Sequence, residues 1–276
     1  MGDTGYEKRG QANMSAVIGF LINLQFFTVI PLKKALPMEK PFIHRAIQTF
    51  PLVGVLLGLV MGAVLYAMVE WTPFSTLSIA FVLWLLTIVL TGGLHLDGWI
   101  DTSDAFFSYQ DKERRLEIMK DSRTGAFGVI SVIVLLAMRF LFIYEIVDRL
   151  TVWSYFLIII MPFLSKCVMG YLLCKMPLAK QEGLGAFFQS AARKNSLHVY
   201  WLYLLASAVI AFVLGTKLGI LLMILMIASG LFLLFLKKKI VQWYGGITGD
   251  VLGASVEGVE LWLWFILWLL HYFVTG

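Results

Sequence analysis

Long stretches of apolar residues follow one another along the chain, separated by short polar segments. Seven of them have the roughly 17 to 25 residues that an α-helix needs to cross a bilayer. They are residues 51–69, 76–95, 126–147, 151–174, 197–214, 217–236 and 256–274. Their apolar residues come in blocks rather than at a 3.6-residue period, so each helix is apolar on all sides. One soluble domain could not bury so many such helices, and the pattern predicts an all-α, polytopic membrane protein.

An eighth apolar stretch, residues 15–30, is shorter and contains Asn23 and Gln25. It fits a short span, a tilted span or a helix lying in the membrane interface. We therefore expect a bundle of about seven or eight transmembrane helices, forming a single domain over residues 15–276. Residues 1–14 are polar and show no signal-peptide cleavage site, so we expect an N-terminal tail without a targeting role.

Composition supports a membrane location and argues against other classes. The chain is 60% hydrophobic and 14% charged, whereas a soluble domain carries about 25% charged residues. Basic loops on one side of a membrane account for the net charge of +5, so we expect no nucleic-acid partner. Cys167 and Cys174 lie in one apolar stretch, which predicts neither a disulfide nor a CxxC metal site.

Basic residues alternate between loops in a way that predicts the topology. Four polar segments hold sixteen of the 22 Lys and Arg residues, and these segments are 33–45, 97–125, 175–196 and 237–255. The loops between them hold only Arg149, with Lys217 at the edge of a span. The positive-inside rule then places the four basic segments in the cytoplasm and the C-terminus outside. We predict a multi-pass protein of the cell (inner) membrane and leave the side of the N-terminus open.

Three aspartates follow the second apolar stretch, in GGLHLDGWIDTSDAF. If that helix continues to about residue 107, Asp97, Asp101 and Asp104 fall at i, i+4 and i+7, on one stripe. Like charges this close repel one another, and a divalent cation would reverse the local field. Carboxylate ligands suit Mg²⁺ or Mn²⁺. A solvated helix end paired with nearby Arg or Lys is the alternative, but acids at a membrane edge favour a functional site.

The next polar loop, RRLEIMKDSRTGAFG, has features of a phosphate-binding segment. Asp121 adds a fourth carboxylate between Lys120 and Arg123, and Ser122 or Thr124 is placed to cap the following span. N–H groups at a helix start and flanking cations attract phosphate. An ordinary basic loop is the alternative. Next to a metal site, we favour the phosphate-binding interpretation.

A second acidic helix is predicted in GGITGDVLGASVEGVE. Asp250 and Glu257 stand at i and i+7, and Glu260 lies about one turn beyond Glu257. The glycines between them allow close helix packing, which by itself would explain their presence. Two acidic stripes that end on the same side of the membrane favour one shared site at the cytoplasmic face.

Two further polar residues have more than one interpretation. His95 is either a metal ligand or a hydrogen-bonding residue near substrate, and the second is favoured because Mg²⁺ prefers oxygen ligands. Lys166 lies inside an apolar stretch, where it either snorkels or binds an anion.

Six motifs occur in a characteristic order along the chain. They are FFTVIPL (26–32), FPLVGVLLG (50–58), GGLHLDGWIDTSDAFF (92–107), RRLEIMKDSRTGAFG (114–128), EGLGAFF (182–188) and GGITGDVLGASVE (245–257). Together they resemble the cobalamin synthase family, the adenosylcobinamide-GDP ribazoletransferases of bacteria and archaea. The chain departs from the usual family pattern where it has Trp99-Ile100 for Leu-Ala, Asp104-Ala105 for Asp-Gly and Ser165-Lys166 for Ser-Arg. None of these departures removes a carboxylate.

The resemblance implies a reaction. α-Ribazole, or its 5′-phosphate, attacks the phosphorus that carries the aminopropanol arm of adenosylcobinamide-GDP. GMP leaves, and adenosylcobalamin or its 5′-phosphate forms. Phosphoryl-type transfer needs positioning and charge neutralisation, usually with metal ions on the phosphate oxygens. The expected cofactor is Mg²⁺, and the expected partners are these two small molecules and the lipid bilayer.

The residues and the resemblance together predict roles within the site. The expected Mg²⁺ ligands are Asp97, Asp101, Asp121 and Asp250. The expected phosphate and substrate contacts are Arg45, Lys120, Ser122, Arg123 and Lys166. Asp104 is expected to act as the general base or as a further ligand, and catalysis is expected to involve it together with Asp97 and His95. Glu257 and Glu260 are expected to hold the site residues in position without touching metal or substrate themselves.

Two other functions remain as alternatives. A cation-coupled transporter would carry its acids near the centres of broken spans, whereas these acids lie at cytoplasmic ends. A CDP-alcohol phosphotransferase would show DGxxAR followed by GxxxDxxxD, and this chain lacks both the Ala-Arg pair and that spacing. Whether copies of the chain associate as a homo-oligomer is left open.

Overall fold

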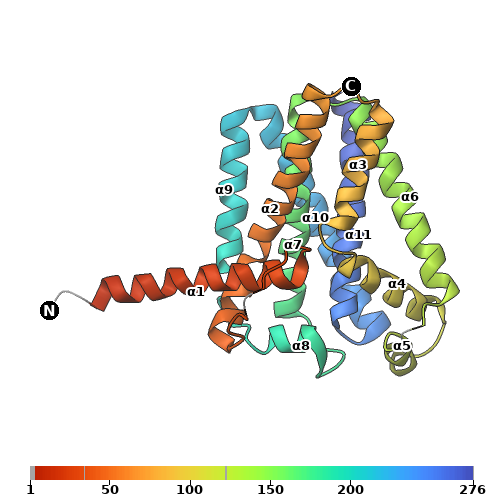
Figure 1. The fold of residues 1–276 in the computed structure, drawn as a ribbon. Coiled ribbons are helices and arrows are strands. Elements are labelled where there is room, and N and C mark those ends of the chain that lie inside the picture. The colour runs from red at the N-terminus through yellow and green to blue at the C-terminus, as the bar shows by residue number, and fades with distance from the viewer. Residues whose placement is uncertain (1–3, 34, 122, 276) are drawn as a thin grey trace.

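The fold is an all-helical bundle (Figure 1), seen in a computed structural model that describes residues 4–33, 35–121 and 123–275. Within these residues there are eleven α-helices and a short π-helical turn after the last one. In chain order the helices are α1 (Thr4–Phe27), α2 (Lys40–Trp71), α3 (Thr76–Val89), α4 (Leu94–Phe107), α5 (Lys112–Ile118), α6 (Ala126–Asp148), α7 (Val152–Lys175), α8 (Gly183–Gln189), α9 (His198–Leu214), α10 (Thr216–Tyr244) and α11 (Gly249–Leu270). The all-α prediction is confirmed.

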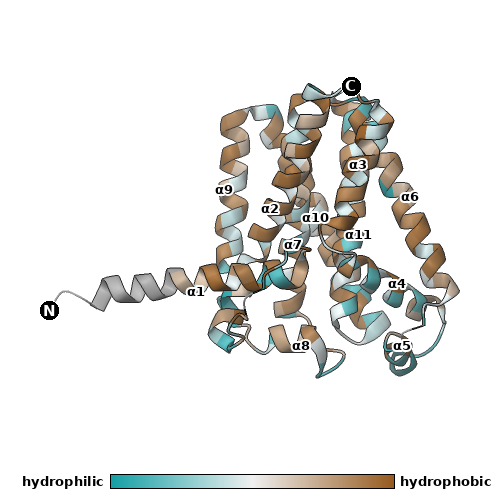
Figure 2. Ribbon diagram, viewed as in Figure 1, coloured by the Kyte–Doolittle hydropathy of each residue, from teal (hydrophilic) through white to brown (hydrophobic). Residues whose placement is uncertain are grey.

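The long helices consist mostly of hydrophobic residues along their whole length (Figure 2), as in a polytopic membrane protein. Among the described residues, five helices are long and apolar enough to cross a membrane, or six if α3 and α4 count as one bent span. The expected seven or eight spans also included α9, which has 17 residues, and the short apolar part of α1.

The second predicted span is broken. α3 and α4 meet at an angle of 78°, so the expectation of one helix continuing to residue 107 is wrong. The physical reason is the Gly92-Gly93 pair, which has φ angles of 63° and 75°. Positive φ angles interrupt the helix after α3, and glycine adopts them without the steric strain that a side chain would cause. α4 then starts as a separate helix, and within it Asp97, Asp101 and Asp104 keep the predicted i, i+4, i+7 spacing.

Small residues hold α2 and α7 in close contact at the centre of the bundle. Gly54 packs against the backbone of Pro162, and a Cβ on Gly58 would overlap the carbonyl of Ile159. Close approach of this kind is how helices associate where water provides no driving force. This close contact fixes the position of α7 relative to α2 along the bundle axis.

The four basic segments meet at one end of the bundle, the lower end in Figure 1, where α5, α8 and the start of α2 lie. The C-terminus and the loops with few basic residues lie at the opposite end. α1 runs across the direction of the other long helices rather than alongside them, which favours the interfacial helix among the alternatives for residues 15–30. Asn23 fixes α1 to α2 by donating hydrogen bonds to the carbonyl of Ala46 and the hydroxyl of Thr49.

Candidate functional site

Two glycines bring the start of α4 against the start of α11. A Cβ on Gly98 would lie 2.7 Å from the carbonyl oxygen of Asp250, and a Cβ on Gly253 would lie 3.3 Å from the Cα of His95. Any larger side chain at Gly98 would push the two helices apart. The glycine after Asp97 therefore allows α4 to hold His95 and Asp97 beside Asp250.

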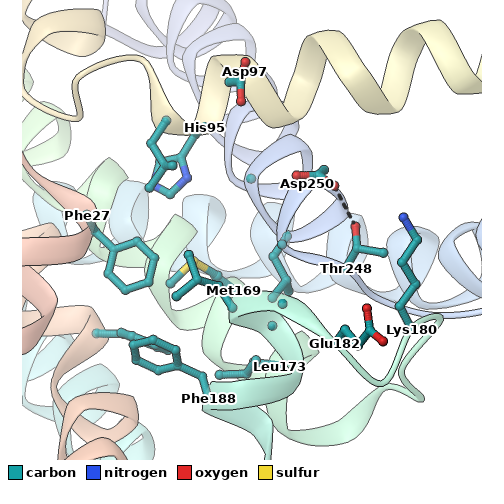
Figure 3. A pocket seen from close by; sticks show the side chains of 18 of the residues that line it. Phe27, His95, Asp97, Met169, Leu173, Lys180, Glu182, Phe188, Thr248 and Asp250 are labelled. Atoms are coloured by element: carbon teal, nitrogen blue, oxygen red, sulfur yellow. Dashed lines mark hydrogen bonds between the residues drawn. The ribbon is translucent and has the colours of Figure 1, made fainter. Parts of the chain in front are cut away.

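A cavity of about 360 Å³ lies where these two helix starts meet α7, α8 and the neighbouring loops. We call it the candidate pocket, and its size is within the usual range for small-molecule sites. One part is apolar and is lined mainly by Phe27, Phe50, Met169, Leu173 and Phe188. The other part is polar, and Figure 3 shows its lining residues His95, Asp97, Lys180, Glu182, Thr248 and Asp250. Lys120 also lines the cavity and is close enough to Lys180 for their charges to interact.

Backbone pairing positions the two loops that form the polar part. The amide of Ile247 donates to the carbonyl of Pro177 at 2.8 Å, and the amide of Ala179 donates to the carbonyl of Ile247 at 3.0 Å. Gly246 is required at this junction because a Cβ there would collide with the Pro177 carbonyl. The pairing joins the segment after α7 to the turn before α11, and so holds Lys180 near Asp250.

The start of α11 forms one wall of the polar part. Thr248 is the N-cap residue, and its hydroxyl accepts a hydrogen bond at 3.1 Å from the amide of Val251. The first backbone N–H groups of a helix favour a nearby anion, whether a side-chain carboxylate such as Asp250 or a phosphate. This wall therefore suits a ligand that carries phosphate.

Lys180 is held in a partly buried position. Its Nζ donates a 2.7 Å hydrogen bond to the carbonyl of Leu116. Burial lowers the pKa of Lys180 from its usual value, and the charge of Lys120 lowers it further, while Asp250 acts in the opposite direction. Two lysines that repel each other across a pocket are stabilised when an anion binds between them.

His95 is oriented by a buried lysine. Its Nε2 lies 2.6 Å from the Nζ of Lys166, and the two residues are 3% and 1% exposed. When Lys166 is protonated its amine can only donate, and then Nε2 of His95 accepts and Nδ1 carries the hydrogen. The ring also stacks on Phe27, with 6.2 Å between ring centroids. His95 is thus a fixed N–H donor on the pocket wall, whereas Lys166 lies behind it and does not line the pocket.

A charged network continues from Lys166 into the bundle. Arg139 of α6 forms a buried ion pair with Glu257 of α11, and the hydroxyl of Ser165 donates to the Glu260 carboxylate at 2.8 Å. Lys166 interacts electrostatically with both of these glutamates. Glu257 and Glu260 therefore lie near Lys166, and their supporting role stays a prediction. The Arg139 partner was not predicted, because nothing in the sequence indicates which acid a lone arginine in a span will meet.

The other two aspartates of α4 lie next to the pocket rather than on its wall. Asp101 is close enough to interact electrostatically with Asp97, Asp104 and Asp250. Asp104 points at the start of α6, where its Oδ1 accepts a 3.3 Å hydrogen bond from the amide of Gly128. Gly125 is needed there, because a Cβ would overlap the Asp104 carboxylate. In this structure Asp104 satisfies a free N–H group of a helix start.

The predicted phosphate-binding residues are only partly brought together. Lys120 lines the candidate pocket, but Asp121 and Arg123 form an exposed ion pair with 2.7 Å between Oδ2 and Nη2. Hydrogen bonds from Arg123 lower the pKa of Asp121 to about 2. Arg45 donates to the side-chain oxygen of Gln48 at 2.8 Å and does not line the pocket. Ser122 lies outside the described residues.

The chemistry of the pocket is compatible with Mg²⁺. Among the described residues, no three His, Cys, Asp or Glu side chains form a ready metal cluster. Mg²⁺ does not need one, since it commonly binds one or two carboxylates and fills its other positions with water and substrate phosphate. Asp97 and Asp250 line the same cavity and fit that requirement, with Asp101 adding negative charge behind them. Metal binding by the four predicted aspartates stays a prediction.

Lys180, Glu182 and Thr248 were not predicted as site residues. The first two belong to a basic segment whose EGLGAFF motif was part of the resemblance, and Thr248 precedes Asp250 in the TGD motif. For Glu182 and Thr248 the motifs therefore contained the signal, whereas Lys180 lies just outside EGLGAFF. What the sequence could not show is that the two loops pair through their backbones.

Comparison with known proteins agrees with the motifs. Residues 19–268 match the profile of a family described as cobalamin-5-phosphate synthase. A protein of Geobacillus sp. (strain WCH70), named adenosylcobinamide-GDP ribazoletransferase, is 40% identical over 259 residues, which cover 93% of this chain and 97% of that protein. A protein of the same name from Clostridium tetani is 33% identical over 261 residues, covering 94% of this chain and 99% of its own length. No solved structure matches the chain.

These matches extend over almost all of the fold, including every segment that lines the candidate pocket. They confirm the resemblance noted from the six motifs, and the chain belongs to the cobalamin-5-phosphate synthase family.

Proposed function

We propose that the chain is an adenosylcobinamide-GDP ribazoletransferase that works at the candidate pocket. It joins α-ribazole, or its 5′-phosphate, to adenosylcobinamide-GDP and releases GMP. The observation that carries this proposal is the placement of the HLD and TGD aspartates, Asp97 and Asp250, on one cavity wall with Lys120 and Lys180. Family membership supports the reaction, and the geometry supports the location.

The polar part of the pocket is suited to the diphosphate of adenosylcobinamide-GDP. Lys120 and Lys180 would neutralise its non-bridging oxygens, and the first N–H groups of α11 would donate to them. The N–H of His95 would provide a further donor, held in place by Lys166. Mg²⁺ bound at Asp97 and Asp250 would supply the remaining neutralisation of charge on the transferred phosphoryl group and on the leaving GMP.

The apolar part of the pocket is suited to the second substrate. Phe27, Phe50 and Phe188 contact one another with ring centroids 5.4 to 5.8 Å apart. Aromatic surfaces of this kind stack on flat rings such as the base of α-ribazole. The pocket holds about 360 Å³, so most of the bulky corrin would remain outside it while the diphosphate enters.

The proton of the attacking hydroxyl must pass to a base. Asp104 was predicted for this role, but its carboxylate lies at the start of α6. Glu182 lines the pocket and is solvent-exposed, and its carboxylate makes it the better placed acceptor. We expect Glu182→Gln to lower kcat more than Asp104→Asn does. Equal kcat in Glu182→Gln and wild type, with a large loss in Asp104→Asn, would return the role to Asp104.

The proposed activity is tested with purified full-length protein in liposomes. The two substrates and Mg²⁺ are added together, and GMP and the corrinoid product are measured by chromatography. GMP release that requires both substrates, with transfer of the lower-ligand nucleotide to the corrinoid, supports the proposal. Correctly inserted protein that makes no such product, or that releases GMP without α-ribazole or its phosphate, would contradict it. Comparing the free nucleoside with its 5′-phosphate identifies the preferred acceptor.

The candidate pocket is proposed to face the cytoplasm. It lies at the bundle end that carries the four basic segments, where the positive-inside rule places the cytoplasm. The diphosphate of adenosylcobinamide-GDP is charged, so this substrate would reach the pocket from water.

A further inference from the structure

A second and larger cavity lies among α4, α6, α10 and α11. Its volume is about 930 Å³, and among the described residues it shares no lining residue with the candidate pocket. We call it the lateral groove. Its walls are almost entirely aromatic and aliphatic, and nothing in the proposed reaction requires it.

The lateral groove is long and follows the helix axes. It is lined along α6 from Phe127 to Phe142, along α10 from Phe232 to Tyr244 and along α11 from Val251 to Phe265. At 1.5 Å per residue each of these stretches is about 20 Å long. α6 and α11 begin at the basic end of the bundle, and α10 ends there. The groove therefore runs from that end into the membrane. Its length is comparable with the thickness of one leaflet, which is half of a hydrocarbon core about 30 Å thick.

The groove is open along one side, on the lipid-facing surface of the bundle. Side chains that line it are also exposed on the outer surface, including Phe127, Ile130, Val134 and Met138 on α6 and Phe235 on α10. Both of these helices pack on α11, which forms the floor between them. In a bilayer, exposed apolar side chains at this level are in contact with acyl chains.

The basic end of the groove carries groups typical of a membrane interface. Lys239 lines it, with its Nζ 5.2 Å from the centroid of the Trp243 ring, and the exposed Tyr109 lies on the same lining. Trp, Tyr and Lys gather at the level of lipid headgroups. On the wall formed by α4, the Trp99 Nε1 and the Thr102 Oγ1 are buried, and neither has a hydrogen-bond partner among the residues that the structure describes. Protein atoms cover these two polar groups, so the groove presents an apolar wall to an acyl chain at this level.

We propose that the lateral groove binds an anionic membrane phospholipid, with an acyl chain along α6, α10 and α11 and the phosphate near Lys239. The length of the groove, its opening toward lipid and the cation at its headgroup end all favour this occupant. The ring system of a soluble substrate is compact rather than elongated, and it would need more polar partners than this lining offers. This proposal is independent of the proposed transferase activity.

The lipid would contact the same helix that carries the catalytic residues. Trp99 and Thr102 line the groove, whereas His95 and Asp97 of α4 line the candidate pocket. A lipid in the groove would therefore contact α4 close to the place where Gly98 packs against α11. A site of this kind gives the bilayer a direct structural link to the pocket.

The test measures bound lipid, so it does not depend on activity. Full-length protein is reconstituted in nanodiscs of phosphatidylcholine with or without phosphatidylglycerol and then transferred to mild detergent, and retained lipid is counted by native mass spectrometry. Lys239→Gln is compared with Lys238→Gln, an exposed neighbour that does not line the groove. Met138→Trp, which narrows the groove, is compared with Ile133→Trp, a lipid-facing control on the same helix.

We expect wild type and the two controls to retain phosphatidylglycerol in preference to phosphatidylcholine. Lys239→Gln should reduce that preference about fivefold, the effect of one lysine near an anionic surface. Met138→Trp should reduce retention of both lipids. Equal retention in Met138→Trp and Ile133→Trp would overturn the proposal. So would displacement of the lipid by adenosylcobinamide-GDP, which would make the groove part of the substrate site, or a stable dimer that Met138→Trp dissociates, which would make it an interface.

Discussion

Removing one partner of the buried Arg139–Glu257 pair is expected to destabilise the bundle strongly. Arg139 is 0% exposed and Glu257 is 2% exposed, and Arg139 also donates a 3.3 Å hydrogen bond to the Thr87 hydroxyl. Losing one member of such a pair leaves an uncompensated charge away from water, at a cost of about 3–5 kcal/mol. Losing both charges together restores the balance, so the double variant should be more stable than either single variant.

The two single variants should not be equal. Glu257→Gln leaves a guanidinium that cannot lose its proton, so its cost should be close to 5 kcal/mol. Arg139→Met leaves a carboxylate that can take up a proton and that also interacts with Lys166, so its cost should be near 3 kcal/mol. The double variant should lie within about 2 kcal/mol of wild type, since a neutral pair often replaces a buried ion pair without large loss.

Unfolding in mixed micelles with increasing SDS, followed by tryptophan fluorescence, measures these differences. The order expected is Glu257→Gln least stable, then Arg139→Met, then the double variant, then wild type. Single variants within about 1 kcal/mol of wild type would show that the pair contributes little, as exposed pairs do. A double variant as unstable as the sum of the single variants would refute the coupling between the two charges.

Three further predictions concern packing, substrate binding and metal. Gly58→Leu should separate α2 from α7 and abolish a monodisperse peak in size-exclusion chromatography, whereas Gly230→Leu, with open space around it, should not; equal profiles would contradict the packing argument. Since burial lowers the pKa of Lys180, its cation is present below that lowered pKa and is lost as pH rises through it, so the KM for adenosylcobinamide-GDP should rise with pH in wild type. Lys180→Met should show a high KM with no such rise, and parallel pH profiles would remove Lys180 from the diphosphate contacts. EDTA should abolish GMP release and added Mg²⁺ should restore it, while a metal-independent rate would refute the role of the ion.

The helices could be predicted from the sequence because apolar blocks and loop charges act locally. The limits of the spans were harder, since α2 begins at Lys40, eleven residues before the predicted stretch, and carries Pro51 inside it. The break at Gly92 and Gly93 was visible as a glycine pair, but a glycine pair also occurs in continuous helices. Only the positive φ angles, which depend on how α3 and α4 pack, distinguish the two.

The site could be predicted only in part, because motifs identify residues but not the elements that these residues contact. Asp97 and Asp250 belong to recognisable motifs, and the structure places both on one cavity wall. Asp104 shares the α4 stripe, yet the start of α6 takes its carboxylate as a hydrogen-bond acceptor. Helical spacing places side chains on a face, but it does not say which neighbouring element will use each one. Lys180 entered the site through backbone pairing of two loops, which no pattern in the sequence reveals.

The central claim is that phosphoryl transfer takes place at the pocket between α4 and α11. The most direct test is the single-turnover rate of GMP release by Asp250→Asn, with Asp148→Asn as the control, because Asp148 is an exposed acid at the opposite end of α6 from the pocket. Both variants are compared at equal amounts of inserted protein with saturating Mg²⁺. The account predicts a loss on the order of 100-fold or more for Asp250→Asn and a wild-type rate for Asp148→Asn. A wild-type rate for Asp250→Asn would contradict it.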